Sequence, residues 1–238
     1  MDGFLTGKKA LVTGGTRGIG RAIVEALLRE GAAVALCGRS AERVRAAVKE
    51  MAAFAGEAVS GTKADVSLLE DVRALFSFVD SRLGGVDILV NNAGTGIFRS
   101  VGEMTPEEWH QIIDLNLSGV FYCCREALAR FRARGGGFII NISSLAGKNP
   151  FAGGAAYNAS KFGLNGFTEA MMMDHRYDNV RVSYIMPGSV DTEFRPGQER
   201  ADWKIAAEDI AEIVLAVLRM PERTLISRVE VRPSKPRK

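Results

Sequence analysis

The stretch Thr13-Gly14-Gly15-Thr16-Arg17-Gly18-Ile19-Gly20 follows an apolar run at Lys9–Val12 and opens a segment of helical periodicity at Gly18–Glu30. Gly14 permits a sharp turn, Gly18 lets the backbone approach a pyrophosphate, and Gly20 lets the helix pack closely against the strand. The start of the helix offers unpaired N–H groups and a partial positive charge to phosphates. Because the glycines stand between the first strand and the first helix, the stretch predicts a dinucleotide-binding loop.

Strand-like and helical segments alternate from this loop almost to the end of the chain. The predicted strands are Lys9–Val12, Ala33–Cys37, Ala58–Lys63, Asp87–Val90, Gly137–Ile142, Val180–Ile185 and Thr224–Val231. The predicted helices are Gly18–Glu30, Ala41–Phe54, Ser67–Leu83, Pro106–Arg132, Ala155–Tyr177 and Ala207–Leu218. We therefore predict an α/β fold, a Rossmann-type doubly wound parallel sheet of about seven strands with helices on both faces. It forms one domain over residues 1–231, followed by a basic tail at 232–238.

Two of these helices have recognisable starts. Ser67, with Glu70 three residues later, is the expected N-cap of the third helix. Thr105-Pro106-Glu107 is the expected start of the fourth.

Composition excludes several classes of protein. Apolar residues make up 47% of the 238 residues, which is ample for a core on both sides of a sheet. Three cysteines without C-x-x-C spacing indicate neither a disulfide framework nor a zinc site, and we expect no metal. No signal-peptide-like start and no apolar run of ~20 residues is found, so we expect a cytoplasmic protein with no membrane partner.

The charge is concentrated at one end of the chain. The net charge of +3 depends on Arg232, Lys235, Arg237 and Lys238, so a basic face for nucleic acid is not expected. This tail is interpreted either as a solvated end or as a contact for an anionic partner.

The end of the second strand bears on the choice of dinucleotide. An NAD-specific site usually places a carboxylate there to bind the ribose 2′-hydroxyl. This sequence has Gly38 and the cationic Arg39 instead, and Arg17 supplies a second guanidinium. Two guanidinium groups form charge-assisted bonds to a 2′-phosphate that a hydroxyl cannot match. The pattern favours NADP(H), while a solvated loop charge is the other interpretation of Arg39.

A second group of polar residues predicts proton chemistry. Ser144 follows a predicted strand, at the edge where open α/β sheets bind ligands. Tyr157 and Lys161 are four residues apart on the next helix, so they share one helical face. A Tyr pKa near ~10 is too high for proton exchange at neutral pH, and a neighbouring ammonium lowers it. The spacing therefore favours Tyr157 as a general acid or base.

Together these features resemble the short-chain dehydrogenase/reductase family over nearly the whole chain. The motifs that carry the resemblance are the glycine loop, Asp65-Val66, Asn91-Asn92-Ala93-Gly94, Asn116, Ser144, Tyr157-x-x-x-Lys161 and Pro187-Gly188. The resemblance implies that Tyr157 protonates a carbonyl oxygen as hydride arrives and that Ser144 hydrogen-bonds the same oxygen. It implies that Lys161 holds the nicotinamide ribose and that Asn116 holds a water for a proton relay. The family's spacing from serine to tyrosine selects Ser144 over Ser143.

The same resemblance implies a cofactor site. Asp65 and Val66 would contact adenine, Asn92 and Gly94 would shape the cofactor floor, and Thr192 would hold the carboxamide. The expected cofactor-binding residues are Gly14, Thr16, Arg17, Gly18, Ile19, Gly20, Arg39, Asp65, Val66, Asn92, Ala93, Gly94, Tyr157, Lys161, Pro187, Gly188, Val190 and Thr192.

The substrate stays open at this point. The resemblance implies NADP(H)-dependent interconversion of a ketone or aldehyde and an alcohol. The alternative is a 3-oxoacyl-acyl-carrier-protein reductase, whose acidic carrier could meet Arg130, Arg132 and Arg134, although a solvated helix end explains them equally. A non-catalytic NADP(H)-sensing protein fits less well, because the catalytic set is intact. A Ser–His–Asp hydrolase is not supported, since no G-x-S-x-G elbow exists.

The sequence also suggests the shape of the substrate cleft. The expected walls are Ile97, Phe98, Leu145, Phe151 and Phe194, with Lys148 and Arg195 at the rim. The segment Glu193–Ala206 contains Pro and Gly and is too short for a long helical lid, so we expect an open cleft. The alternative is that a partner subunit's tail closes it. The helices Pro106–Arg132 and Ala155–Tyr177 carry surplus apolar residues, and the resemblance implies a homodimer or homotetramer built on them.

Overall fold

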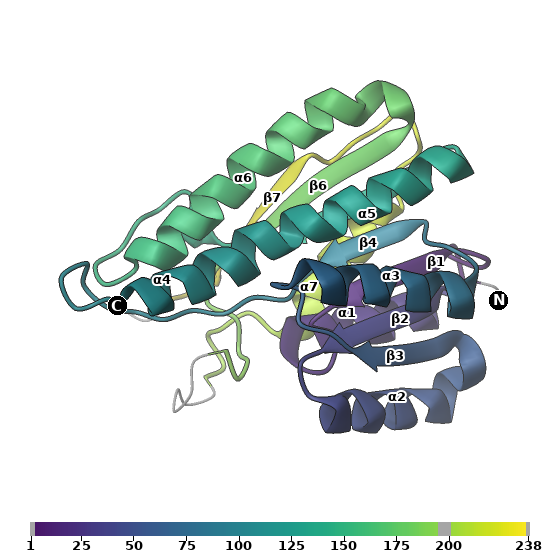
Figure 1. Cartoon of the computed structure of the whole chain (residues 1–238), viewed down its shortest axis with the longest axis horizontal. Helices are drawn as coiled ribbons and strands as arrows, with labels where there is room; N and C mark the ends of the chain where they lie inside the picture. The colour runs from purple at the N-terminus through teal and green to yellow at the C-terminus, as the bar shows by residue number, and fades with distance from the viewer. Residues whose placement is uncertain (1–2, 195–200, 237–238) are drawn as a thin grey trace.

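The computed structural model describes residues 3–194 and 201–236, and within them it contains a seven-stranded sheet. The strands are β1 (Lys9–Thr13), β2 (Ala33–Gly38), β3 (Val59–Lys63), β4 (Ile88–Asn91), β5 (Gly137–Ile142), β6 (Val180–Pro187) and β7 (Arg228–Val231). Their order is β3-β2-β1-β4-β5-β6-β7, and every neighbouring pair is parallel. The chain winds outward in both directions from the boundary between β1 and β4 (Figure 1), which confirms the predicted doubly wound sheet.

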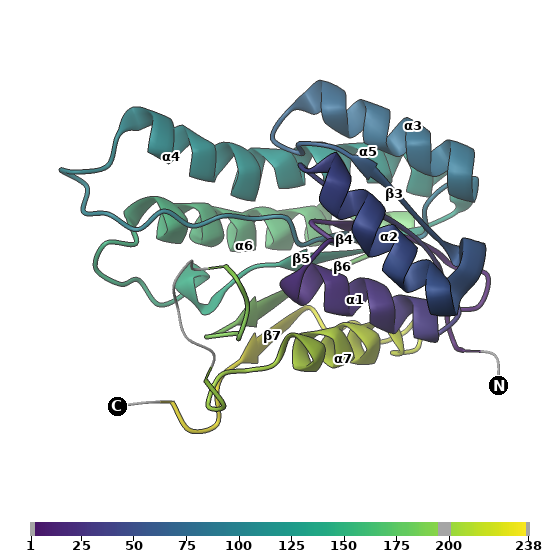
Figure 2. The same cartoon turned by 90° about the horizontal axis from the view of Figure 1, so that it is seen from below.

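Helices cover both faces of this sheet (Figure 2). One face carries α1 (Gly18–Arg29), α2 (Ala41–Ala55) and α7 (Ala207–Leu218). The other carries α3 (Leu69–Leu83), α5 (Gly119–Arg134) and α6 (Ala155–His175). Alternate residues of a strand point to opposite faces. Ala10 and Val12 therefore join the core of the first face, whereas Leu11 joins the core of the second.

The predicted helix from Pro106 to Arg132 is present but interrupted. It begins as α4 (Pro106–Ile113) with a capping box, in which the Thr105 hydroxyl accepts from the Glu108 N–H and the Glu108 carboxylate accepts from the Thr105 N–H, both at 3.2 Å. A π-helical turn, Asp114–Ser118, then joins α4 to α5. In Figure 1 the three pieces run as one rod.

Ser67 is not the N-cap of α3, contrary to the prediction. Its hydroxyl and its backbone N–H both donate to Asp65 Oδ1, at 2.7 and 3.1 Å. This local turn delays the helix to Leu69, and Asp71 rather than Glu70 reaches back, accepting from the Asp65 N–H at 2.8 Å. The bonds to Asp65 are favoured over N-capping by Ser67, because the Asp65 carboxylate accepts from both the hydroxyl and the N–H of Ser67.

The last strand also starts later than predicted. β7 begins at Arg228 instead of Thr224, because residues 221–224 form a turn in which the Thr224 N–H donates to the Pro221 carbonyl at 2.8 Å. Pro221 has no N–H to offer a neighbouring strand, so the turn is the favourable local solution.

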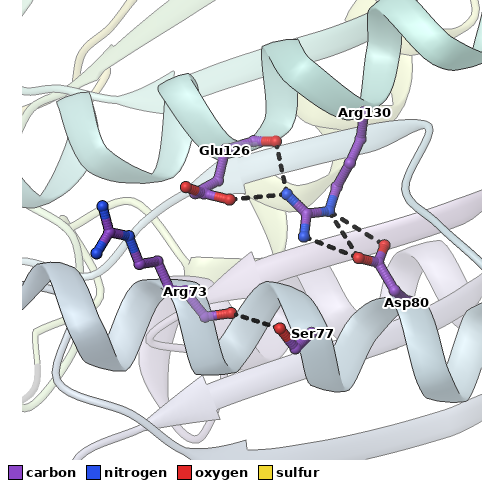
Figure 3. A network of polar contacts seen from close by, with 5 residues as sticks. All are labelled: Arg73, Ser77, Asp80, Glu126 and Arg130. Atoms are coloured by element: carbon purple, nitrogen blue, oxygen red, sulfur yellow. Dashed lines mark hydrogen bonds and ion pairs between the residues drawn. The ribbon is translucent and has the colours of Figure 1, made fainter.

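Arg130 joins α3 to α5 (Figure 3). Its Nε and Nη2 donate to the Asp80 carboxylate of α3 at 2.8–3.1 Å, and its Nη1 donates to the Glu126 carboxylate at 2.8 Å. The guanidinium also lies 4.9 Å from the centre of the Phe76 ring. Arg134 donates twice to Asp87 Oδ1, at 2.9 and 3.0 Å. These two arginines are therefore held within the chain, which weakens the case for a carrier-binding patch.

None of the described helices is long and apolar enough to cross a membrane. Within residues 3–194 and 201–236, no cluster of His, Cys, Asp and Glu side chains is arranged to hold a metal ion. The three cysteines are free and buried. Burial raises the pKa of the Cys37 and Cys124 thiols to about 12, so neither forms a reactive thiolate at neutral pH.

Candidate active site

A cavity of about 1010 Å³ lies along the carboxyl ends of the strands, where the chain winds away in both directions. Every residue expected to bind the cofactor, from Gly14 to Thr192, lines this cavity. Ser144, Tyr157 and Lys161 line it as well. Asn116 lies behind the wall and is completely buried.

The glycine loop has the backbone geometry that a phosphate cradle needs. Gly14 and Gly18 have φ of +66° and +54°, a region that favours glycine. A Cβ on Gly20 would lie 2.2 Å from the Gly14 carbonyl oxygen, so a side chain does not fit there. Arg17, at the N-cap of α1, makes no capping bond with its side chain, which leaves the first N–H groups of the helix for a ligand. The loop therefore fits a pyrophosphate at the helix start.

Asn92 holds this loop against the segment that follows β4. Its Nδ2 donates to the carbonyls of Thr13 and Gly14, at 3.0 and 3.1 Å. In return the Thr13 hydroxyl accepts from the N–H groups of Asn92 and Ala93, both at 3.1 Å. Asn92 thus shapes the floor of the cavity through the protein backbone.

The cavity is strongly basic where it passes the end of β2. Arg17, Arg39 and Arg43 line it there. Arg17 forms an exposed ion pair with Glu193 at 2.9 Å. Arg39 and Arg43 have no carboxylate partner among the residues that the structure describes.

Sequence reasoning missed Arg43. Ser40 is the N-cap of α2, and its hydroxyl accepts from the Arg43 N–H at 3.3 Å. A basic residue three positions after an N-cap that follows β2 lies in the first turn of the helix, beside the Arg39 loop. That spacing was the signal.

Tyr157 and Lys161 share one face of α6, as their spacing predicts. Lys161 Nζ lies 5.8 Å from the centre of the Tyr157 ring and donates to the Ile142 carbonyl at 3.0 Å. Lys161 is only 5% exposed, and burial lowers its pKa to about 8. The Ser144 hydroxyl accepts from the Ala146 N–H at 3.1 Å. A phenol, a hydroxyl and a basic nitrogen therefore line one cavity, a set able to polarise and protonate a bound carbonyl.

Asn116 lies in the π-helical turn between α4 and α5. Its Oδ1 accepts from the Thr95 N–H and its Nδ2 donates to the Thr95 carbonyl, both at 2.9 Å. Nδ2 also donates to the Ser160 hydroxyl at 3.1 Å, and Ser160 donates to the Tyr157 carbonyl at 2.8 Å. Asn116 thus connects the loop after β4 to the helix that carries Tyr157, while its part in a water relay stays a prediction.

Aromatic side chains surround Tyr157. Its ring centre lies 5.5 Å from that of Phe98 and 5.8 Å from that of Phe194, and Phe98 and Phe151 are also 5.8 Å apart. Leu145 lines the same cavity, as predicted.

Two of the other expected cleft residues are placed differently. Ile97 is half-buried and does not line the cavity. Lys148 is turned to Glu230, in an ion pair of 2.6 Å. Arg195 lies outside the described residues.

The C-terminal segment reaches the cleft of its own subunit. Arg232, Pro233 and Pro236 line the cavity. Arg232 pairs with Glu230 at 3.0 Å, and a Cβ on Gly188 would lie 3.1 Å from the Pro233 ring. Arg237 and Lys238 lie outside the described residues. The described part of the tail therefore borders the site.

Comparison with known proteins decides the family. Residues 8–203 match the short chain dehydrogenase family. The chain belongs to the short-chain dehydrogenase/reductase family. It is an oxidoreductase that acts on CH–OH groups.

Two curated relatives of this short-chain dehydrogenase come from Mediterraneibacter gnavus. A 3beta-hydroxysteroid dehydrogenase is 40% identical over 218 residues, which cover 89% of this chain and 77% of the relative. A 3alpha-hydroxysteroid dehydrogenase is 39% identical over 191 residues, which cover 80% of this chain and 76% of the relative.

Solved structures agree with this fold. A metagenomic short-chain oxidoreductase in complex with NADP has a TM-score of 0.86 and 39% identity, over 98% of this chain and 99% of that one. A 3-ketoacyl-(acyl-carrier-protein) reductase from Brucella melitensis complexed with NADH has a TM-score of 0.86 and 28% identity, over 95% of this chain and 96% of that one.

Proposed function

We propose that this short-chain dehydrogenase interconverts a ketone or aldehyde and an alcohol, with NADP(H) as cofactor and Tyr157 as proton donor. The proposal is carried by one observation: Tyr157 and Ser144 line the same cavity as the glycine loop. The bound nicotinamide supplies or accepts the hydride. In reduction, Tyr157 gives its proton to the carbonyl oxygen and Ser144 donates a hydrogen bond to the same oxygen. Protonated Lys161 stabilises the phenolate that remains.

Charge at the end of β2 supports NADP(H) over NAD(H). Arg39 and Arg43 line the cavity without a carboxylate partner in the described chain, and Gly38 offers no acidic side chain. A 2′-phosphate provides the acceptor oxygens that two guanidinium groups bind well.

Cofactor titration tests this preference. We expect NADPH to bind at least about tenfold more tightly than NADH, about 1.4 kcal/mol, and Arg39→Asp to remove or reverse the preference. Nicotinamide fluorescence gives both dissociation constants. Equal affinities in the wild-type protein would contradict the assignment.

The walls and the relatives together support a proposal for the substrate class. Two relatives of nearly equal identity are named for the 3β- and 3α-hydroxyl of steroids. The described cleft wall is apolar and aromatic, with Phe98, Phe151 and Phe194 near Tyr157. We therefore infer a hydroxyl or ketone on an apolar ring system. Because the two relatives differ in the face of the ring, the stereochemistry does not follow from them.

A second candidate is the reduction of a 3-oxoacyl thioester, favoured by the likeness to the Brucella melitensis reductase. It is the weaker proposal, because Arg130 and Arg134 are paired with Asp80 and Asp87. NADPH oxidation with ring ketones and with a 3-oxoacyl thioester separates the two. Faster turnover of the thioester at equal concentration would favour the second.

Tyr157→Phe tests the proton donor. The variant should lose nearly all turnover while its NADPH dissociation constant stays within a few fold, because the hydroxyl acts on the substrate. Tyr177→Phe is the matched control, since Tyr177 is 93% exposed and does not line the cavity. Substantial turnover in Tyr157→Phe would mean that another group supplies the proton.

A further inference from the structure

One stripe of α6 is polar although it faces the protein. Asn158, Lys161, Asn165 and Thr168 follow a spacing of three, four and three residues, which places them on a single helical face. Each donates to or accepts from the segment between Asn141 and Phe151. That segment carries Ser144, and the two members of the stripe that bond to residues 143–147, Asn158 and Asn165, determine where the Ser144 hydroxyl lies.

Asn165 grips this segment on both sides of Ser144. Its Oδ1 accepts from the Ser143 hydroxyl at 2.6 Å, and its Nδ2 donates to the Gly147 carbonyl at 3.0 Å. Only this orientation of the amide satisfies both partners, because a carbonyl oxygen cannot donate. One side chain therefore ties the two ends of the turn 143–147 together through hydrogen bonds.

The turn is tight. A Cβ on Gly147 would lie 2.5 Å from Asn165 Nδ2 and 2.7 Å from the Lys161 carbonyl oxygen, so the segment touches the helix backbone there. Ser143 is buried, and Asn158 adds a bond of 2.6 Å to the Ala146 carbonyl. Ser144 lines the cavity, and its hydroxyl accepts from the Ala146 N–H at 3.1 Å and donates to the Pro187 carbonyl in a long bond of 3.5 Å.

We propose that Asn165 and Ser143 form a positioning pair that fixes the Ser144 hydroxyl for its bond to the substrate oxygen. Asn165 does not line the cavity, and Ser143, which does, uses its hydroxyl on Asn165, so the pair acts through Ser144. The inference rests on the proposed function, in which Ser144 donates to the carbonyl. It assigns a use to Ser143 that is different from that of its neighbour.

The expected effect is on turnover. A hydrogen-bond donor displaced by about 1 Å can cost on the order of 100-fold in rate. Asn165→Leu keeps the size of the side chain and removes its bonds to Ser143, to Gly147 and to Met186 Sδ, so we expect kcat to fall by roughly 10- to 100-fold. Ser143→Ala removes one bond and should cause a smaller fall. The NADPH dissociation constant should stay within about twofold, because the variants do not change the glycine loop or the arginines Arg17, Arg39 and Arg43.

A matched control lies one turn along the same stripe. Thr168→Val removes a buried hydroxyl that accepts from Asn141 Nδ2 at 2.8 Å, and Asn141 lies outside the turn 143–147. It should reduce the free energy of unfolding in urea as Asn165→Leu does, yet keep kcat near that of the wild type.

The decisive measurement is a double-mutant cycle with Ser144→Ala. In that background Asn165→Leu should change kcat by less than about twofold, since the group that it positions is gone. An equal loss in both backgrounds, or wild-type kcat in both Asn165→Leu and Ser143→Ala, would overturn the proposal. If Asn165→Leu does not fold, Ser143→Ala and its own cycle decide. Full activity of Ser144→Ala alone would instead sink the proposed function, so the two failures are distinguishable.

Discussion

Lys161 is a lysine that the fold tolerates at a cost in stability. It is 5% exposed, and burial lowers its pKa from 10.5 to about 8. Below pH 8 the amine is protonated in both the folded and the unfolded chain, and the folded chain bears the full cost of a buried charge. Between pH 8 and 10.5 the unfolded chain binds more protons than the folded chain, so stability from this group rises with pH.

Lys161→Met should therefore be more stable than the wild type at pH 7. The advantage should shrink by about 2 kcal/mol between pH 7 and pH 9.5, as the wild-type amine loses its proton in the folded state. Urea unfolding of both proteins at the two pH values measures this. A constant difference would show that the amine is not desolvated as its burial indicates. Loss of turnover in the same variant would show that Lys161 lowers stability but is needed for the reaction.

Single residues were predictable from sequence where a motif fixes their place. The glycine loop, Ser144, Tyr157 and Lys161 line one cavity because the carboxyl ends of parallel strands share one edge. Asn165 and Arg43 were not predicted. The significance of Asn165 comes from its contact with Ser143, which neither hydrophobic pattern nor spacing expresses, whereas the spacing of Arg43 from the N-cap Ser40 was a signal that was overlooked.

Among the helices and strands, bounds set by apolar periodicity were predicted well. α7 and β5 match the predicted ranges, Ala207–Leu218 and Gly137–Ile142. The π-helical turn at Asp114–Ser118 was not predicted. A π-helical turn contains one residue more than an α-helical turn. Asn116 in that turn bonds to Thr95, which is 21 residues away in the chain, so a tertiary contact explains the additional residue. Local competition for Ser67 misplaced the start of α3 in the same way.

The pairing of α3 with α5 through Arg130 makes a prediction about stability. Asp80→Ala removes a bidentate partner from a guanidinium whose side chain is only 20% exposed. We expect a loss of about 1–2 kcal/mol in the free energy of unfolding, since Arg130 keeps Glu126 but loses Asp80. The rate of turnover should not change, because neither residue lines the cavity. Urea unfolding and a turnover assay check the two halves.

Glu70→Ala is the control for that variant. Its pair with Arg73 also lies on α3, but the two side chains are 79% and 51% exposed. Exposed ion pairs contribute little, so a change within about 0.5 kcal/mol is expected. Equal losses in the two variants would mean that burial of Arg130 adds nothing.

At the scale of the whole molecule, the outer faces of α5 and α6 leave apolar side chains in solvent. Phe121 is 44% exposed on α5 and contacts Phe167 of α6 at 6.2 Å between ring centres. Phe162 is 46% exposed on α6. A patch of this kind favours a two-fold interface, and we predict a homodimer or homotetramer.

Light scattering at micromolar concentration tests the assembly. Phe121→Glu should shift the protein to smaller species, whereas Phe54→Glu on α2, at a similarly exposed phenylalanine on the other face, should not. A wild-type monomer at micromolar concentration would refute the interface.

The segment Glu193–Ala206 borders the substrate cleft. Ile205 lies beside the loop that follows β6: the Asp191 N–H donates to the Ile205 carbonyl at 2.8 Å, and the Ile205 N–H donates to the Ser189 carbonyl at 3.0 Å. Residues 195–200 of the expected short lid lie outside the described structure, and the described remainder of Glu193–Ala206 contains no helix. The tail of the same subunit, with Arg232 and Pro233, borders the site.

The cavity of about 1010 Å³ holds the cofactor site as well as the substrate, and its substrate end has the apolar walls Phe98, Phe151 and Phe194 with no described helix over them, so we expect it to surround a small substrate loosely. One methylene more or less in an apolar pocket changes discrimination by only ~1–3 kcal/mol. We therefore predict activity on a range of medium-sized ring and aromatic ketones, with modest preference among neighbours. The measurement is kcat/KM across a homologous series, repeated in a variant truncated after Val231. A thousandfold preference for one ketone over its neighbours would refute the open cleft, and loss of that preference on truncation would assign the closure to the tail.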